Sequence, residues 1–140
     1  MMRAYVDTSV LLRFITGAPA EQALQSAALF KAAETGEVTL VLDEIVIAEA
    51  VWVLSSFYKF SKDEIKDVLQ VIVASEGIAM TDEMGALLAL TLFADLNVDF
   101  EDALISVHMS RDPIADVFTF DKHFNRLSGV NGLSPSEFMK

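Results

Sequence analysis

Short apolar runs alternate along the chain with longer segments in which apolar residues recur every three or four positions. A short run with β-branched residues predicts a buried strand, and the longer spacing predicts a helix with one apolar face. The expected strands are residues 3–6, 38–42, 77–80, 115–120 and a last one from 130, followed by a helical turn. The expected helices are residues 9–15, 20–36, 43–58, 61–77, 82–96, 99–110 and a short one at 121–127. Strands and helices alternate without a linker or a repeat, which favours one α/β domain.

Several helix ends carry capping residues. Ser61 stands three residues before Glu64, the spacing of a capping box, and Gly77 ends the same helix. Asp99 and Asp102 have the same spacing and predict the start of another helix. These residues indicate where helices begin, but they leave open whether an acid at such a place has a further role.

The composition is that of a folded protein. Of 140 residues, 53% are hydrophobic and 22% are charged, and the length fits one domain. The most apolar helical segment, residues 84–94, is shorter than the roughly 20 residues that a membrane span needs. Asp7 and Arg13 interrupt the apolar N-terminal region, so we expect no signal peptide, no membrane partner and a cytoplasmic location.

The residue types restrict the chemistry. The chain has no cysteine, which excludes disulfides, thiolate metal sites and cysteine nucleophiles. Any metal must therefore be bound by oxygen ligands or by His108 and His123. The net charge of -11, from 21 acidic and 10 basic residues, argues against nucleic-acid binding through a broad basic face. It favours a basic partner, or carboxylates gathered around hard cations.

Three acids occupy positions where a cap and a ligand are both plausible. Asp7 and Asp121 each follow a predicted strand and precede a predicted helix. This edge of an α/β sheet is where ligand-binding residues collect. Each of the two acids is equally placed to cap its helix, and Asp102 belongs to a predicted capping box. The two roles are compatible, so the local pattern leaves both open.

Glu49 lies in an unusually apolar predicted helix. The residues three and four positions away from it are Ile45, Val46, Trp52 and Val53, so we expect this stripe to be buried. A buried carboxylate must be matched to a cation or neutralised. The alternative is that Glu49 faces solvent.

The remaining candidates have weaker support. Asp99 and Asp116 are expected to be structural or peripheral. His108 lies well inside a predicted helix, where a surface or packing role is expected. His123 is close to Asp121, but no second histidine follows at the spacing of a zinc pair.

Carboxylates without cysteine form a ligand set for a hard cation. Mg²⁺ prefers carboxylates and water, and Mn²⁺ commonly replaces it. Such ions act on phosphates by activating a water and stabilising the leaving oxygen of an in-line displacement. The acids therefore predict phosphodiester hydrolysis without a catalytic histidine or cysteine.

The order of the acids resembles that of the PIN-domain metal-dependent ribonucleases, and among them the VapC-type toxins of toxin–antitoxin pairs. The residues that carry the resemblance are Asp7 in DTSVLL, Glu49 in VIAEAVWVL, Asp102 in VDFEDALI and Asp121 in FTFDKHFNRL. It extends from about residue 4 to residue 133. Ser9 stands where the family usually has Asn, and Thr119 matches the family's hydroxyl residue before the last acid.

The resemblance implies a three-layer α/β/α fold with a central, mainly parallel sheet, in a single domain over residues 1–140. It implies an endoribonuclease that depends on Mg²⁺ or Mn²⁺, with Asp7 and Asp102 as ligands and Asp121 as a ligand directly or through water. Glu49 is expected to bind the metal or to orient its water. Ser9 and Thr119 are expected to support the ligands.

The resemblance also implies partners. RNA would be the substrate, with Arg13, Lys122 and Arg126 steering its backbone, although each of these residues is equally well explained as ordinary surface charge. Bound cations would offset the acidic charge. A homodimer is implied, and so is a cognate antitoxin whose C-terminal segment blocks the site.

Two other interpretations remain. A receiver-type phosphoacceptor domain also uses strand-end acids and Mg²⁺, but it needs paired acids near the N-terminus and a later strand-end Lys, for which no suitable residues are found. A non-catalytic PIN-like module that only binds partners is the second. The presence of all four acids argues against it, and Ser9 argues in its favour.

Overall fold

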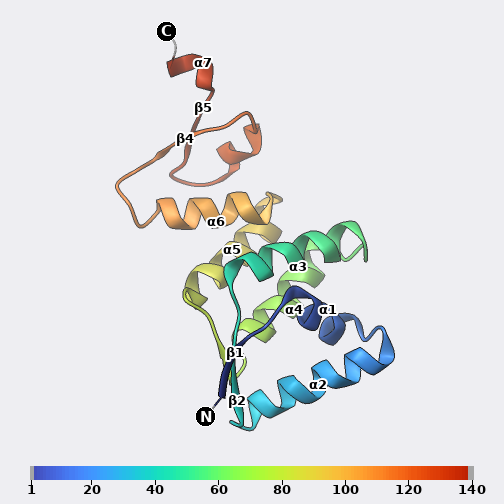
Figure 1. The fold of residues 1–140 in the computed structure, drawn as a ribbon. Coiled ribbons are helices and arrows are strands. Elements are labelled where there is room, and N and C mark those ends of the chain that lie inside the picture. Colours follow the sequence, from blue (N-terminus) through green and yellow to red (C-terminus); the bar gives the residue numbers. More distant parts are fainter. Residues whose placement is uncertain (1, 139–140) are drawn as a thin grey trace.

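Five parallel strands within residues 2–138, the part of the chain that this computed structural model describes, form two separate sheets (Figure 1). The first sheet contains, in this order, β1 (Met2–Tyr5), β2 (Val38–Val41) and β3 (Ile78–Ala79). The second contains β4 (Asp116–Phe118) and β5 (Asn131–Leu133). In the first sheet Ala4 lies opposite Leu40, which lies opposite Ile78. In the second, Val117 lies opposite Gly132.

Helices pack around the first sheet and connect it to the second. They are α1 (Thr8–Thr16), α2 (Ala20–Glu34), α3 (Glu44–Ser56), α4 (Lys62–Val73), α5 (Glu83–Leu96), α6 (Phe100–Met109), the 3-10 helix η1 (Lys122–Arg126) and α7 (Pro135–Phe138). The predicted capping box of α4 is confirmed, because the Ser61 hydroxyl accepts from the Glu64 N–H at 3.1 Å and Glu64 Oε1 accepts from the Ser61 N–H at 2.9 Å. Helix α5 ends at Asn97, whose left-handed backbone (φ 53°) redirects the chain toward α6.

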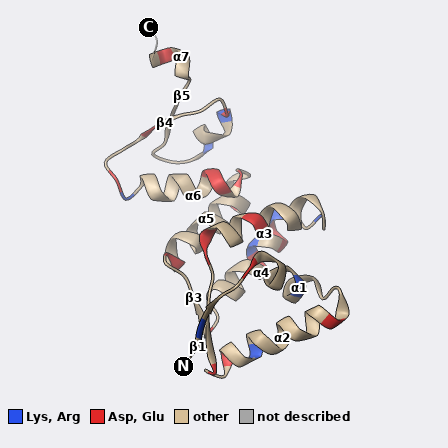
Figure 2. Cartoon of the chain, viewed as in Figure 1, with Lys and Arg blue, Asp and Glu red and all other residues tan. Residues whose placement is uncertain are grey.

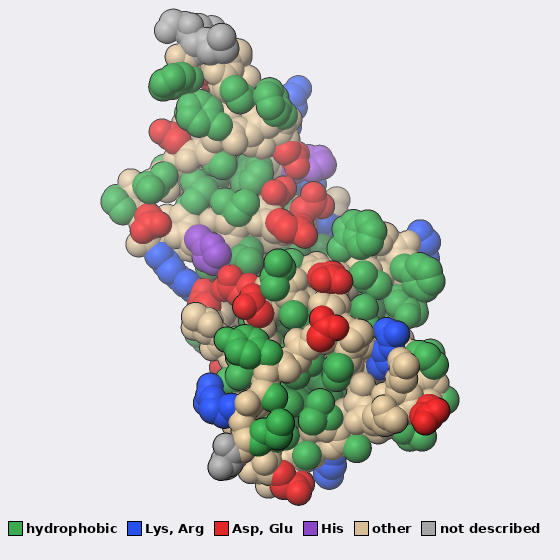
Figure 3. Space-filling view, in the orientation of Figure 1, with side chains coloured by type: hydrophobic (Ala, Val, Ile, Leu, Met, Phe, Trp, Pro, Cys, Tyr) green, Lys and Arg blue, Asp and Glu red, His purple; other side chains and the backbone are tan. Residues whose placement is uncertain are grey.

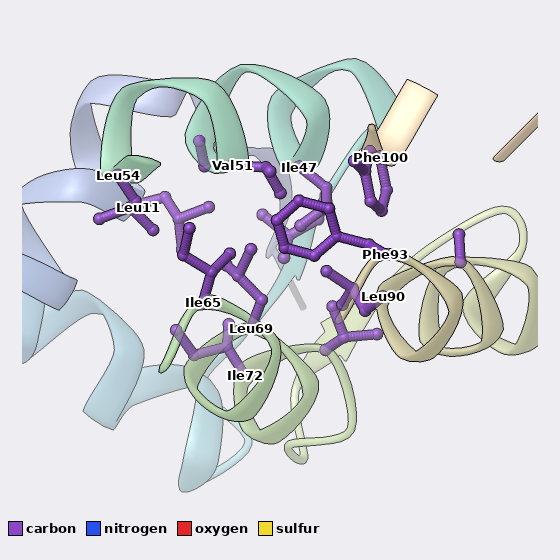
Figure 4. Packing of buried hydrophobic residues seen from close by; sticks show 14 of the residues in the cluster. Leu11, Ile47, Val51, Leu54, Ile65, Leu69, Ile72, Leu90, Phe93 and Phe100 are labelled. Carbon is purple, nitrogen blue, oxygen red and sulfur yellow. The ribbon is translucent and has the colours of Figure 1, made fainter. Parts of the chain in front are cut away.

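The hydrophobic core joins the first sheet to α3, α4, α5 and α6 (Figure 4). Its buried side chains include Leu40 of β2, Ile47 of α3, Leu69 of α4, Phe93 of α5 and Phe100 of α6. Burial of each such side chain contributes about 1.5–3 kcal/mol to stability. The first residue of α6 is thus fixed in the same core as the sheet.

Helix α6 ends at the edge of the first sheet where β2 and β3 finish. His108 Nε2, near its last turn, lies 3.7 Å from Oε2 of Glu44, the first residue of α3. Arg111 forms an ion pair with Asp82, the cap of α5. From this edge the chain leads outward, and the second sheet, η1 and α7 lie beyond α6, on the far side from β1 (Figure 1).

The predicted α/β class with parallel strands is confirmed, with three differences in detail. The strand expected at residues 115–120 is shorter, and the helix expected at 121–127 is a 3-10 helix. The single sheet expected from the sequence is divided into two. Among residues 2–138, no helix is long and apolar enough to cross a membrane.

Candidate active site

Three carboxylates come together where α6 and η1 begin. One oxygen from each of Asp99, Asp102 and Asp121 lies within 4.8 Å of the others. Asp99 caps α6, Asp102 is in its first turn, and Asp121 caps η1 shortly after β4. Figure 2 shows acidic positions at the start of α6, and Figure 3 shows acidic side chains gathered over this part of the molecule. Two segments distant in sequence therefore form one group, which we call the acid cluster.

The capping box predicted for Asp99 and Asp102 is wrong. Asp99 is the cap of α6, but its side chain accepts no capping hydrogen bond. Both carboxylates are therefore available as ligands. Asp99, expected to be structural or peripheral, belongs to the acid cluster. The signal for this was its spacing from Asp102, since residues three apart lie on one side of a helical turn.

The carboxylates of the acid cluster repel one another when all are ionised. Partial burial, followed by the charges of Asp99 and Asp121, raises the pKa of Asp102 to about 6. Asp121 Oδ1 accepts a hydrogen bond from the His123 N–H at 2.8 Å, and the Asp121 N–H donates to Thr119 Oγ1 at 2.9 Å. Thr119 therefore positions the backbone of Asp121, while the N–H of His123 orients its carboxylate.

Two cationic side chains hold the segment that leads into α6. Lys62 Nζ donates to the Val98 carbonyl at 2.9 Å, and Arg126 Nη1 donates to the Asn97 carbonyl at 2.6 Å. Burial lowers the pKa of Lys62, against the opposing effect of the Asp99 charge. The sequence indicated Arg126 but not Lys62, because a lysine at a helix start carries no signal of a partner 36 residues away.

Asp7 lies at the end of β1, outside the acid cluster. It precedes α1, but its side chain makes no capping hydrogen bond. The Ser9 hydroxyl instead donates to Asp7 Oδ2 at 2.8 Å, which lowers the pKa of the exposed Asp7 carboxyl. Ser9 and Arg13 line a pocket of about 440 Å³ against α2, where Arg13 Nε donates to Gln22 Oε1 at 2.9 Å.

Glu49 is exposed on α3. The expected buried stripe around it is wrong, since Ile45 and Trp52 expose 71% and 66% of their surface. The alternative, in which Glu49 faces solvent, is the one observed. Within the described residues, neither Glu49 nor Asp7 belongs to a group of three ligand atoms within 4.8 Å. The chain thus brings together two of the four acids proposed from the sequence, Asp102 and Asp121.

Comparison with known proteins decides the family. The family model of the PIN domain matches residues 4–130. The chain belongs to the PIN domain family. It is also 28% identical over 134 residues to a protein named VapC ribonuclease from Aquifex aeolicus (strain VF5), a match that covers 94% of this chain and 96% of that protein. The predicted VapC-type PIN resemblance and the three-layer α/β/α PIN-like fold are confirmed.

The acid cluster of this PIN domain fits a hard divalent cation. Its ligand atoms are carboxylate oxygens, which suit Mg²⁺ and Mn²⁺. Burial and then the charges of the neighbouring carboxylates raise the pKa of Asp102, and a cation between the carboxylates would relieve their repulsion. Such an arrangement can bind a cation and present it to a phosphate group.

A second group of potential ligands in the PIN domain has a structural role. Atoms of Glu44, Asp82 and His108 lie within 4.8 Å of one another. Both oxygens of Asp82 are already engaged, because Arg111 bonds to each of them and the Gly85 N–H donates to Oδ1 at 3.0 Å. This group therefore fastens the end of α6 to the starts of α3 and α5.

Proposed function

We propose that this PIN domain is a metal-dependent endoribonuclease that hydrolyses RNA phosphodiester bonds and serves as the toxin of a toxin–antitoxin pair. The observation that carries the proposal is the acid cluster, in which Asp102 and Asp121 converge from distant segments. Membership of the PIN family and similarity to a protein named VapC ribonuclease support it. Residues 1–140 would act as one catalytic domain, in the cytoplasm.

Asp102 and Asp121 would hold Mg²⁺, or Mn²⁺ in its place, together with Asp7. The bound ion supplies positive charge at the scissile phosphate and makes water a better nucleophile. Asp99 lies close enough to the other two cluster acids to contribute a further oxygen. For Asp7 to join them, the end of β1 and the acid cluster must come together.

The other polar residues have distinct tasks. Glu49, exposed on α3, would orient the attacking water and take up its proton. Ser9 positions the Asp7 carboxylate through its hydrogen bond, and Thr119 positions Asp121 through the backbone. Neither hydroxyl needs to touch RNA to matter for the reaction.

Basic side chains would contact the RNA backbone. Lys122 and Arg126 are exposed on η1, directly after Asp121, and Arg13 lies in the pocket beside Ser9. These positions border both Asp7 and the acid cluster, so a phosphate bound between them would meet positive charge. The cognate antitoxin would inhibit the enzyme by placing a basic residue against the same carboxylates, and the toxin would act as a homodimer.

Metal-dependent RNA cleavage tests the proposal. Purified protein is expected to cleave structured RNA in Mg²⁺ or Mn²⁺ and not in EDTA. Asp102→Asn and Asp121→Asn are each expected to slow cleavage by more than about 100-fold, because even the supporting partners of metal ligands are worth about 10- to 100-fold. The matched control is Asp95→Asn, an exposed acid on α5, which should cleave at the wild-type rate.

Two outcomes would contradict the proposal. Equal cleavage by both Asn variants and the wild type would assign the activity to another site or to a contaminating nuclease. Failure of the wild type to cleave any RNA with either metal would favour a PIN module that only binds partners.

A further inference from the structure

The outer edge of β1 lies open in the structure. Among residues 2–138, β1 pairs with β2 on one side and with no strand on the other. Parallel strands are normally buried, yet Met2 and Tyr5 expose 66% and 75% of their surface. A row of unpaired backbone groups beside exposed apolar side chains is a surface for strand pairing.

Part of the sheet face next to this edge is also open. A hollow of about 350 Å³ lies against all three strands of the first sheet, lined by Arg3 and Tyr5 of β1, Val41 of β2, and Ala79 and Thr81 at the end of β3. A sheet in a layered α/β protein buries both faces against other elements. Within residues 2–138, this hollow leaves part of the sheet face open beside the unpaired edge of β1.

The second sheet has the complementary open edge. It consists of two parallel strands of 3 residues each, and a two-stranded sheet is marginal on its own. Phe118 of β4 and the nearby Phe120 expose 54% and 87% of their surface, and Phe118 packs edge-on against exposed Phe138 at 6.1 Å. The second sheet therefore carries exposed apolar side chains of its own at and beside β4.

Contacts within the chain hold β4 away from its own β1. Arg111 is bound to Asp82 directly after α6. Beyond β4, Arg126 donates to the Asn97 carbonyl, and Phe124 and Leu127 are buried in the core. With these contacts in place the second sheet lies beyond α6 (Figure 1). These contacts keep β4 apart from β1 of the same chain.

We propose that two copies of this chain pair reciprocally, with β4 of each copy joining the open edge of β1 of the other as a parallel neighbour. Each copy has one donor edge, on β4, and one acceptor edge, on β1, so a two-fold dimer uses both edges of both copies and closes. The Phe118 and Phe138 side chains of one copy then face the uncovered sheet of the other. A second copy is the occupant that matches both surfaces at once.

This pairing completes the active site from two chains, a part of the inference that rests on the proposed function. Asp7 follows β1 and Asp121 follows β4. Parallel neighbours end at the same edge of a sheet, so Asp7 of one copy meets Asp121 of the other. Asp102 belongs to the same acid cluster as Asp121, so it lies at the same site. Each dimer then has two sites, and each site draws acids from both copies.

Cross-linking tests the strand pairing without reference to activity. Because the chain has no cysteine, Tyr5→Cys in one size-tagged copy and Phe118→Cys in another are unique reactive groups. After the two are unfolded and refolded together, a short bismaleimide is expected to join tagged to untagged chains. Leu24→Cys on α2, also exposed, replaces Tyr5→Cys in the control and should give no such product. A wild-type monomer in sedimentation, or no linkage between tagged and untagged chains, would overturn the proposal.

Complementation tests the shared site. Asp7→Asn and Asp121→Asn are each expected to be inactive alone. Refolding equal amounts together should restore about a quarter of wild-type cleavage, because half of the dimers are mixed and each of these has one intact site of two. If each site lay within one chain, the mixture would stay inactive, which would overturn the shared site. Inactive wild-type protein that still cross-links between chains would refute the proposed function and leave the pairing established.

Discussion

Ser9 stabilises the ionised carboxylate of Asp7 through a hydrogen bond. Its hydroxyl donates to Asp7 Oδ2 from within the first turn of α1 and is the largest cause of the lowered pKa of Asp7. An Asp7 carboxylate that ionises readily is a better ligand for a cation. Among the contacts of the described residues, the serine side chain therefore supplies the one hydrogen bond that the Asp7 carboxylate receives from another side chain.

Replacing Ser9 by Ala is expected to weaken metal binding rather than the fold, so that cleavage requires more Mg²⁺. At limiting Mg²⁺ the rate should fall by about tenfold, the lower end of the effect of losing a ligand's supporting partner. Saturating Mg²⁺ should restore most of it, and Ser9→Thr, which keeps the hydroxyl, should behave as wild type. A rate that falls equally at all Mg²⁺ concentrations would assign Ser9 a purely structural role.

The sequence predicts four acids as site residues, and among residues 2–138 the structure brings two of them together, Asp102 and Asp121. Asp102 and Asp121 meet because the first turn of α6 lies beside the start of η1, a contact between distant segments that the local pattern does not specify. Glu49 was expected in a buried stripe, but Ile45 and Trp52 are exposed. Apolar spacing alone does not show which face of an apolar helix is covered, because this depends on where distant elements pack.

At the scale of elements, Asp82 and Arg111 join α5 to the end of α6. The hydrogen bond from Arg111 is the main cause of the lowered pKa of Asp82, and the Gly85 N–H lowers it further. The folded protein therefore binds this proton less tightly than the unfolded chain does. The stabilisation is present above the ordinary pKa of 3.8 and is lost as the pH falls through the lower folded value.

Asp82→Asn is expected to lower the free energy of unfolding by about 0.5–1 kcal/mol near neutral pH, since it removes the charge pair but keeps a capping side chain. The difference from wild type should shrink as the pH falls below 3.8. Urea unfolding at several pH values measures it, with Asp95→Asn, exposed on the same helix, as the control. A difference that stays constant with pH would mean that the charge of Asp82 does not stabilise the fold.

Element types and helix starts were predictable because their causes are local. The Ser61 and Glu64 capping box forms as its spacing indicates. The predicted strand at residues 115–120 ends early because Thr119 Oγ1 accepts a hydrogen bond from the Asp121 N–H, which begins a turn inside it. The pattern of apolar residues shows that a strand can form, whereas the hydrogen bond that ends it depends on side-chain geometry.

At the scale of the whole molecule, the division of the strands into two sheets could not be predicted. Each strand signal is a short apolar run, and such a run does not specify its neighbour. Here α6 ends at the finishing edge of β2 and β3, fixed there by Asp82 and Arg111, so β4 begins on the far side from β1. Among the described residues Asp7 lies outside the acid cluster, and the proposed reciprocal pairing of two copies would bring them together.

A charge on the open edge of β1 is expected to separate the dimer while leaving each acid unchanged. Tyr5→Lys puts an ammonium group where the partner's apolar β4 side chains would pack, and lysine is a residue that blocks edge pairing in natural sheets. The dimer should weaken by about tenfold or more, which corresponds to about 1.4 kcal/mol, and RNA cleavage should fall in step with the dimer fraction. Sedimentation and cleavage measured over the same protein concentrations show whether the two change together. Leu24→Lys, at an exposed position on α2, introduces the same charge and should change neither the dimer nor the cleavage rate. A Tyr5→Lys monomer that cleaves RNA at the wild-type rate would show that one chain forms the site alone.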